Sequence, residues 1–330
     1  MSKDIGIDLG TANVLIHVKG KGIVLNEPSV VALNKQTRKV LAVGEEARQM
    51  VGRTPGNIVA IRPMKDGVIA DFDITEAMLT YFMNKLELRS MFSKPRILIC
   101  CPTQITNVEQ KAIREAAEKA GGRTVLLEEE PKVAAIGAGM DIFQPCGNMI
   151  IDIGGGTTDV AVLSMGDVVT SESIKVAGDT FDNEILYYIK KQYKLLIGER
   201  TAEAIKMTIG TVYPDGRNEV MDIRGRDMVN GLPRTIEVNS AEIQEALQES
   251  IAMLIQAAKN VLEKTPPELS ADIIDRGIIL TGGGALLHGL DMLLTEELLV
   301  PVLVAEDPMH CVAKGTGILL ESMGTAKVRR

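Results

Sequence analysis

The sequence predicts an α/β protein in which two related domains face each other across a cleft. Strand-like and helix-like segments alternate along the 330 residues, a length greater than one hydrophobic core usually absorbs. The same strand, turn and strand pattern also occurs once in each half. Its turn carries an aspartate and then glycine, as IDLGT at 7–11 and as IDIGGGT at 151–157. We therefore expect two similar domains, each contributing one turn to the cleft.

Apolar periodicity and capping residues define the elements of the first half. Runs rich in β-branched residues predict strands at 5–18, 23–33, 39–43, 96–101 and 124–127. Thr75 is the expected N-cap of a helix, and its apolar residues share one face: Met78, Leu79, Phe82, Met83 and Leu86. Thr106 and Glu109 predict a capping box for a second helix, which Gly121 and Gly122 end.

The second half repeats this order. Strands are predicted at 148–163, 167–175, 277–280 and 302–305. A helix at 181–193 directs Ile185, Leu186 and Ile189 inward, and Ser240 is the expected N-cap of a long helix that runs through Leu262. Pro266 and Pro267 end that helix. Further helices are expected after the glycines at 282–284 and at the C-terminus, and residues 213–234 are rich in turn formers.

We expect the chain to divide into two domains with small inserts. The first comprises residues 1–140 and 310–330, with an insert at about 33–65. The second comprises residues 141–309, with an insert at about 181–240.

Composition excludes several classes of protein. Apolar residues make up 45% of the chain and charged residues 24%, which is ordinary for a globular protein, and the net charge of −8 argues against nucleic acid as a partner. The N-terminus enters the first strand without the apolar core of a signal peptide, and no stretch is long and apolar enough to span a membrane. We expect a cytoplasmic protein whose four cysteines are reduced and lack zinc spacing.

The two turns suit a nucleotide with Mg²⁺. Glycine lets the backbone approach a phosphate closely, so that successive N–H groups face its oxygens. Asp8 and Asp152 would repel a triphosphate, but Mg²⁺ is held by one or two carboxylates together with phosphates and water. Either turn alone is more often an ordinary hairpin, so the pair carries the prediction. The chain lacks the G-x-x-x-x-G-K-[ST] signature of a P-loop.

Several motifs then resemble a known superfamily. IDLGT at 7–11, EEP at 129–131 with AAIG at 134–137, DIGGGTTD at 152–159 and TGGG at 281–284 occur in the order of the phosphate, connector and adenosine motifs of the actin, Hsp70 and sugar-kinase fold. LNEPSVVA at 25–32, RDMV at 226–229, GLP at 231–233 and IDRG at 274–277 resemble the MreB family of bacterial actins, particularly its Gram-positive Mbl-type members. The resemblance covers the whole chain. It implies an actin-like, ribonuclease-H-like duplicated fold.

The resemblance also implies ligand contacts. Asp8 and Asp152 would face Mg²⁺ through its waters, and Glu203 and Lys206 would contact the ribose or adenine of ATP or ADP. The remaining nucleotide contacts that it implies are Gly10, Thr11, Ala12, Asn13, Gly154, Gly155, Gly156 and Thr157 around the phosphates, and Gly282, Gly283 and Gly284 beside the adenosine.

Glu130 and Thr158 are the predicted catalytic residues. The resemblance implies that Glu130 positions or polarises the water that attacks the phosphate, and that Thr158 helps to hold it. A carboxylate near that water need only orient it and accept its proton. Pro131 and the small residues after it favour a tightly packed helix with Glu130 at its N-terminal end. The alternative is that residues 128–130 form a solvated acidic loop, and other glutamates remain possible.

The resemblance implies a cytoskeletal function. Such proteins hydrolyse ATP, slowly and coupled to polymerisation, and form paired protofilaments at the inner face of the cytoplasmic membrane. The implied partners are other copies of the chain, the membrane and the proteins of cell-wall elongation, and the implied role is the maintenance of rod shape. No histidine is assigned a role.

A short loop at 88–96 is the candidate membrane contact. Met91 and Phe92 form an apolar pair among the basic residues Arg89, Lys94 and Arg96. One such loop would bind lipid weakly, and a filament would multiply the effect. The alternative is that Phe92 fills the domain core.

Two other functions fit the same fold. A soluble small-molecule kinase would need an acceptor pocket and a general base, typically Asp, and the sequence shows no such constellation. An Hsp70-like chaperone would need a substrate-binding domain, and we expect no room for one after the last nucleotide motif.

Overall fold

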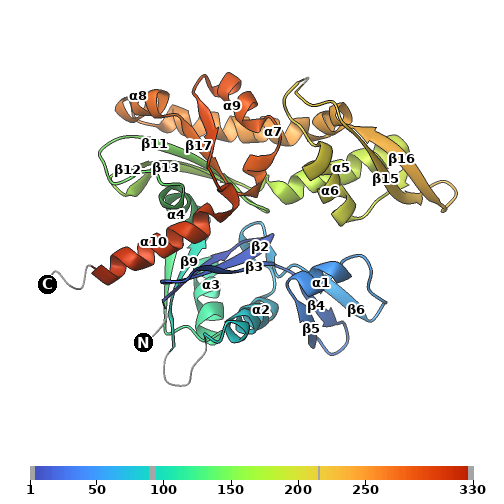
Figure 1. Cartoon of the computed structure of the whole chain (residues 1–330), viewed down its shortest axis with the longest axis horizontal. Coiled ribbons are helices and arrows are strands. Elements are labelled where there is room, and N and C mark those ends of the chain that lie inside the picture. The colour runs from blue at the N-terminus through green and yellow to red at the C-terminus, as the bar shows by residue number, and fades with distance from the viewer. Residues whose placement is uncertain (1–3, 89–93, 215, 326–330) are drawn as a thin grey trace.

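Two five-stranded sheets form the centres of the two halves of the protein (Figure 1). The computed structural model describes residues 4–88, 94–214 and 216–325. The predicted loop pair Met91 and Phe92 lies outside the described residues.

The first sheet has the strand order β10-β9-β1-β2-β3. Strands β1, β2 and β3 form an antiparallel meander, and β9 and β10 continue the sheet parallel to β1. The strands are β1 (Ile5–Leu9), β2 (Asn13–Val18), β3 (Gly22–Pro28), β9 (Arg96–Cys101) and β10 (Thr124–Glu129). Helices α2 (Phe72–Lys85) and α3 (Asn107–Lys119) contribute apolar residues to the same core.

The second sheet repeats this topology, with the order β13-β12-β11-β17-β18. Three antiparallel strands are again extended by two parallel ones. The strands are β11 (Asn148–Ile153), β12 (Thr158–Ser164), β13 (Asp167–Ile174), β17 (Ile278–Thr281) and β18 (Val302–Val304). The helices packed against this sheet are α7 (Ser240–Lys264), α8 (Pro267–Arg276) and α9 (Leu290–Leu298). The duplication predicted from the two turns is therefore present in the strand order.

Two helices lie between the sheets. Helix α4 (Glu130–Gly137) contacts strands of both sheets, and α10 (Cys311–Thr325) packs along α4 and β1. A Cβ atom on Gly137 would lie 1.8 Å from the carbonyl oxygen of Cys311, and one on Gly315 would lie 1.9 Å from that of Val133. Only glycine allows this backbone contact. It fixes α4, whose first residue is Glu130.

Each half carries a smaller unit beside its sheet. The first contains β4 (Val31–Asn34), β5 (Val40–Val43), α1 (Glu45–Met50) and β6 (Ile58–Ile61), followed by the short hairpin β7 (Met64–Lys65) and β8 (Val68–Ile69). The second contains α5 (Gly178–Tyr193), β14 (Leu195–Leu196), α6 (Glu199–Ile209), β15 (Val220–Asp227) and β16 (Pro233–Asn239).

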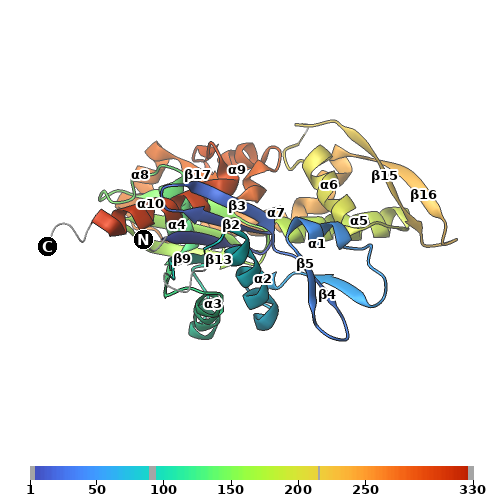
Figure 2. The ribbon, with the colours of Figure 1, turned by 60° about the horizontal axis from the view of Figure 1, so that its bottom comes forward.

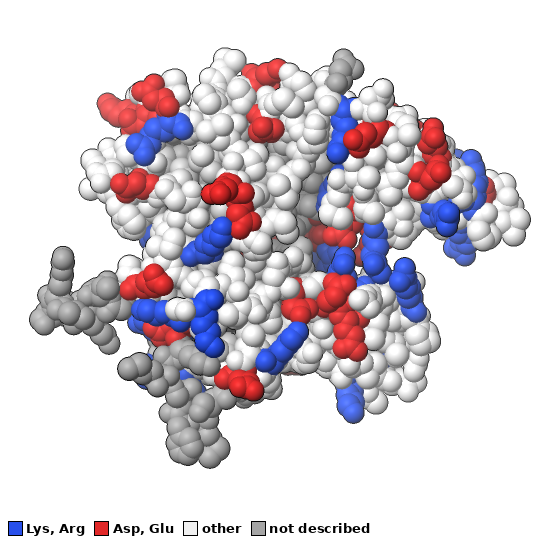
Figure 3. Space-filling model, viewed as in Figure 1, with Lys and Arg blue, Asp and Glu red and all other residues white. Residues whose placement is uncertain are grey.

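Ion pairs join the two smaller units. Arg62 lies 2.6 Å from Asp179, and Arg48 lies 3.7 Å from Glu203. Figure 2 shows the two smaller units at the same end of the molecule, and Figure 3 shows acidic and basic side chains gathered where the two units meet. The outer ends of the two halves are thus in direct contact.

Two predicted helix caps were wrong by a few residues. Asp71 caps α2 by accepting a hydrogen bond from the Ile74 N–H at 3.2 Å, whereas Thr75 lies inside the helix. Asn239 caps α7 by accepting from the Glu242 N–H at 3.1 Å, and the Ser240 hydroxyl instead donates to the Glu219 carbonyl. Both true caps are polar residues immediately before the helix, and tertiary contacts use the predicted ones.

Two other expectations also need correction, and one helix was not predicted. The predicted strand at 23–33 is two strands in different sheets. The first strand ends at Pro28, and the Ser29 N–H then donates to the Ala12 carbonyl of the first turn. The segment at 213–234 is largely the hairpin of β15 and β16. Pro267 opens helix α8, which was not predicted; proline suits the first turn of a helix.

Candidate functional site

The two aspartate-glycine turns have the same local structure. The Gly10 N–H donates to the Asn13 carbonyl at 3.1 Å, and the Gly154 N–H donates to the Thr157 carbonyl at 2.9 Å. Each turn joins the central strand of its sheet to an antiparallel neighbour. Backbone N–H groups at both turns can therefore approach one ligand from two sides.

The turns touch each other between the two sheets. A Cβ atom on Gly155 would lie 2.6 Å from the Cβ of Ala12, and one on Gly156 would lie 2.5 Å from Thr11 Oγ1. No larger residue fits either position without moving the other turn. The structure thus brings together the two groups of glycine, threonine and alanine residues that the sequence assigned to the phosphates.

A third turn, which the sequence analysis missed, completes this arrangement. The Gly67 N–H, between β7 and β8, donates to Thr11 Oγ1 at 3.0 Å. The backbone nitrogen of Asp66 lies 2.9 Å from the position of a Cβ on Gly156. The Asp66-Gly67 dipeptide is itself a turn signal. Its position over the other two turns could not be read from a single sequence.

The two aspartates lie at the ends of equivalent strands. Asp152 is buried and accepts a hydrogen bond from the Thr281 hydroxyl at 2.9 Å. Burial, together with the smaller effect of the Asp152 charge, raises the pKa of Asp8 to about 7. Burial also raises the pKa of Asp152 to about 7, with Asp159 adding to the effect and the Thr281 bond opposing it. Each pKa is raised because a charged carboxylate is poorly solvated here.

Glu130 and Asp159 are two further poorly solvated carboxyl groups close to Asp8 and Asp152. Burial raises the pKa of Glu130 well above its usual value, and the charges of Asp159, Asp8 and Asp152 raise it further. Asp159 is buried and accepts hydrogen bonds from the Thr103 N–H at 3.1 Å and from the Thr103 hydroxyl at 3.2 Å. The sequence analysis assigned Asp159 no role. Four carboxylates therefore converge where the two sheets meet.

The solvated acidic loop considered for residues 128–130 is not formed. Glu128 and Glu129 end strand β10, and Glu130 begins α4. All three side chains are half-buried. Pro131 at the second helical position accounts for the sharp change from strand to helix at this point.

Thr158 is completely buried, and its hydroxyl donates to the Val176 carbonyl at 2.6 Å. The hydroxyl proton is committed to that bond. Thr158 could therefore hold a water only as an acceptor.

Glu203 and Lys206 face different partners. Lys206 Nζ lies 2.9 Å from Asp182 and donates to the Gly178 carbonyl at 3.0 Å, close to the second turn. Glu203 faces Arg48 of the other half.

The glycines at 282–284 pack on the end of β11. A Cβ on Gly282 would lie 2.3 Å from the Ile153 carbonyl oxygen, and one on Gly284 would lie 2.2 Å from Ile153 Cγ2. Gly283 is exposed and would meet nothing within 4 Å. The triplet thus lies directly beside Asp152 and leaves open space at Gly283.

The carboxylates suit Mg²⁺ held through water. In the described part of the chain, no three His, Cys, Asp or Glu side chains are placed to hold a metal ion directly. Mg²⁺ keeps several waters and takes few protein ligands when phosphates are present. A cation would also relieve the repulsion that raises the pKa values of Asp8 and Asp152. The residues present therefore fit the ion.

Replacing Asp8 by Asn should stabilise the protein at about pH 8 when no metal or nucleotide is present. The folded-state pKa of Asp8 lies above the unfolded value, so the folded state binds the proton more tightly. The stability that this proton contributes is fully present at pH values below the pKa that Asp8 has in the unfolded chain. It is lost as the pH rises toward about 7. The increase in the free energy of unfolding caused by Asp8→Asn should therefore become smaller as the pH falls toward about 5.

Urea unfolding in EDTA at both pH values measures this gain. Asp222→Asn, on an exposed position of β15, is the matched control. A gain for Asp8→Asn that does not change with pH would contradict the assignment of a buried, protonated carboxylate.

Comparisons with known proteins agree with this geometry. Residues 2–328 match a family model described as MreB/Mbl protein. The chain is 78% identical over 322 residues to the cell shape-determining protein Mbl of Bacillus cereus, covering 98% of this chain and 97% of the relative. It is 75% identical over 329 residues to Mbl of Bacillus subtilis, covering 100% and 99% of the two chains.

Solved structures show the same fold. MreB5 of Spiroplasma citri bound to ADP superposes with a TM-score of 0.95 at 40% identity and covers 100% of this chain and 99% of its own. The same protein bound to AMPPNP gives a TM-score of 0.94, with coverage of 99% and 98%. The predicted actin-like fold is confirmed. Because sequence and structure agree over nearly the whole length, the chain belongs to the MreB/Mbl protein family.

Proposed function

We propose that this protein is a cell shape-determining bacterial actin whose cleft binds ATP with Mg²⁺ and hydrolyses it slowly. The observation that carries the proposal is the meeting of two equivalent aspartate-glycine turns at a cluster of buried carboxylates. The 40% identical MreB5 of Spiroplasma citri, which was solved with ADP and with AMPPNP, supports a nucleotide in this cleft. The Bacillus relatives, named cell shape-determining proteins, support the biological role.

We propose that each half of the chain supplies one side of the nucleotide site. Residues 1–140 with 310–330 would form one domain and residues 141–309 the other, with inserts at about 33–65 and 181–240. Gly10, Thr11, Ala12 and Asn13 would approach the phosphates from one side, and residues 154–157 from the other. Glu203, Lys206 and residues 282–284 would contact the nucleoside.

The second turn has additional support for binding phosphate. The first two N–H groups of α5 donate to the carbonyls of Gly154 and Gly155, which holds the turn against the N-terminus of this helix. A helix N-terminus carries partial positive charge. Lys206 adds a positive charge nearby, which the ion pair with Asp182 partly offsets. Both features favour an anion at this turn.

Asp8 and Asp152 would hold Mg²⁺ through its waters. When bound, Mg²⁺ supplies positive charge that stabilises the phosphate oxygens during transfer. Positive charge nearby also favours the ionised form of a carboxylate. The pKa of Glu130, which is high without a cation, would then fall, and Glu130 could accept a proton from the attacking water. Thr158 would accept a hydrogen bond from that water.

Glu130→Ala should leave nucleotide affinity close to that of the wild type and slow phosphate release by roughly 10² to 10⁴. The carboxylate acts on the water and not on the bound phosphates. Phosphate release and the binding of a fluorescent ATP analogue measure the two effects. Glu129→Ala is the matched control, because it removes the neighbouring carboxylate. Release at the wild-type rate from Glu130→Ala would exclude Glu130 from the mechanism.

We propose that the protein acts as filaments, in paired protofilaments, at the inner face of the cytoplasmic membrane. There they would organise the proteins of cell-wall elongation and so maintain rod shape. Within the described ranges, no helix is long and apolar enough to cross a membrane. Membrane contact would come from Met91 and Phe92, supported by Arg89 and Lys94 beside them in the sequence. Arg96, the third basic residue of this segment, instead pairs with Asp4 at 2.7 Å.

Replacing Met91 and Phe92 together by Ser should abolish binding of the assembled protein to liposomes and leave the melting temperature nearly unchanged. Side chains on an exposed loop contribute little to the core. If Phe92 instead fills the core, the change should cost several kcal/mol, as Phe→Ala changes do at about 3 to 5 kcal/mol. Co-sedimentation with liposomes and thermal unfolding distinguish the two. Lipid binding that survives together with a strongly lowered melting temperature would reject the membrane role.

A further inference from the structure

We propose that Thr103 is a positioning residue for ATP hydrolysis. It holds Asp159 from across the cleft and thereby sets the distance between the two predicted catalytic residues, Glu130 and Thr158. The inference rests on the function proposed above and adds one residue to it. Thr103 itself touches neither the phosphates nor the attacking water.

Thr103 makes two hydrogen bonds to the same carboxylate oxygen. Its N–H and its hydroxyl donate to Asp159 Oδ1 at 3.1 Å and 3.2 Å. Asp159 is 1% exposed, and hydrogen bonds to a charged group are roughly twice as strong as those between neutral groups. Thr103 belongs to the segment after β9 of the first sheet, whereas Asp159 lies on β12 of the second. The contact therefore joins the two sheets directly.

On the first side, the register of the sheet links Thr103 to Glu130. Strands β9 and β10 are parallel neighbours, and their last residues, Cys101 and Glu129, are paired. Thr103 follows the end of β9 by two residues, and Glu130 follows the end of β10 by one. Both residues thus leave the sheet at the same end. A displacement of this sheet end relative to the second sheet would therefore move both.

On the second side, Asp159 is fixed to the strand that carries Thr158. The two residues are consecutive on β12, and Asp159 is paired with Asp152 of β11. The side chains of Thr157 and Ser173 also hydrogen-bond to the Asp159 carboxylate. The oxygen that Thr103 holds is therefore tied to Thr158 and to the turn that ends at Thr157.

The turn between β7 and β8 closes over this contact. An added Cβ on Gly67 would lie 2.6 Å from Pro102 Cγ and 3.0 Å from Thr157 Cγ2. Pro102 directly precedes Thr103, so Gly67 packs against both sides of the contact at once. A larger residue at Gly67 would push the two sides apart.

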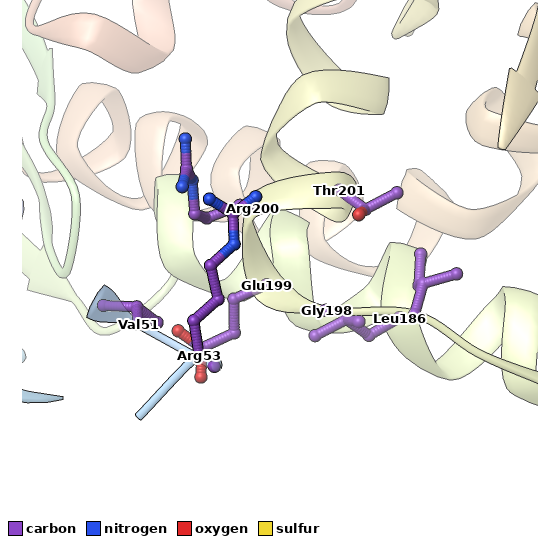
Figure 4. Close-up of a pocket in the computed structure, with 9 residues that line it drawn as sticks. Val51, Arg53, Leu186, Gly198, Glu199, Arg200 and Thr201 are labelled. Carbon is purple, nitrogen blue, oxygen red and sulfur yellow. The ribbon is translucent and has the colours of Figure 1, made fainter. Parts of the chain in front are cut away.

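The contacts farther out hold the halves less firmly. A cavity of about 500 Å³ is lined by Val51 and Arg53 of one smaller unit and by Arg200 of the other (Figure 4). The ion pairs that join these units have partly exposed side chains, and exposed ion pairs contribute little to stability. The buried contact of Thr103 with Asp159 is thus a firmer link between the halves than these outer pairs.

Hydrolysis depends on the separation that this link sets. The oxygen of the water bonds to the γ-phosphorus as the bond to the bridging oxygen breaks, and the proton of the water passes to Glu130. Glu130 and Thr158 hold that water from different halves of the chain. A misplacement of about 1 Å can slow such a step by roughly 10²-fold. Nucleotide affinity depends instead on the turns and the aspartates, so loss of the link should affect the rate much more than binding.

Replacing Thr103 by Val removes the hydroxyl and keeps the size of the side chain. Phosphate release from Mg-ATP should slow by roughly 10-fold to 10²-fold, while the affinity for a fluorescent ATP analogue and the melting temperature stay close to those of the wild type. Thr103→Ser keeps the hydroxyl and should restore most of the rate. Thr265→Val is the matched control, because it removes a buried hydroxyl at the end of α7 that donates to the Val261 carbonyl.

A double-mutant cycle with Glu130→Ala gives the sharper result. If Thr103 acts by placing Glu130, Thr103→Val should cause little further slowing once Glu130 is Ala. Equal slowing in both backgrounds, or a wild-type rate for Thr103→Val, would overturn the positioning role. So would a Thr103→Val protein that loses nucleotide affinity and melting temperature together, because the hydroxyl would then only support the fold. A wild type that releases no phosphate, or Glu130→Ala releasing it at the wild-type rate, would overturn the proposed hydrolysis itself.

Discussion

The convergence of four poorly solvated carboxylates is the constraint on which the rest of the structure depends. Asp8, Glu130, Asp152 and Asp159 converge where the two sheets meet. Burial raises the pKa of each, and the charge of a neighbouring carboxylate adds to this effect for Asp8, Glu130 and Asp152. Charged groups so placed are costly unless a cation or a proton neutralises them. A fold that holds them there suits a positively charged ligand.

The surrounding structure keeps this cluster in place. Asp8 and Asp152 lie on equivalent strands of the two sheets. Glycine contacts between α4 and α10 hold Glu130, the first residue of α4, close to them. The touching turns leave no space for larger side chains at Gly155 and Gly156. Farther out, two ion pairs connect the smaller units. The same geometry would serve a protein that changes its contacts with neighbours when its nucleotide changes.

Local patterns in the sequence predicted the elements of this site better than their contacts. Both turns were predicted, because aspartate and glycine after an apolar strand are a local signal, and so was the capping box of α3, in which Thr106 and Glu109 bond each other. The Asp66-Gly67 turn and the Thr103 bonds to Asp159 were missed, because they join segments far apart in the chain. Thr75 and Ser240 were taken for caps because the chemistry of threonine and serine suits that position. The Thr75 hydroxyl instead bonds to the carbonyls of Asp71 and Pro63, and the Ser240 hydroxyl bonds to the Glu219 carbonyl. The partners of Glu203 and Lys206 likewise depend on the packing of α1 and α5 against α6.

The most direct test of the central claim is the effect of Mg-ATP on thermal stability. A ligand that binds only the folded state stabilises it by about 2.7 kcal/mol at a hundredfold excess over its Kd. Saturating Mg-ATP should therefore raise the melting temperature of the wild type. Asp152→Ala should lose most of this increase, because it removes one of the two aspartates proposed to face the cation. An unchanged melting temperature of the wild type would contradict the assignment of this cleft to a metal-bound nucleotide.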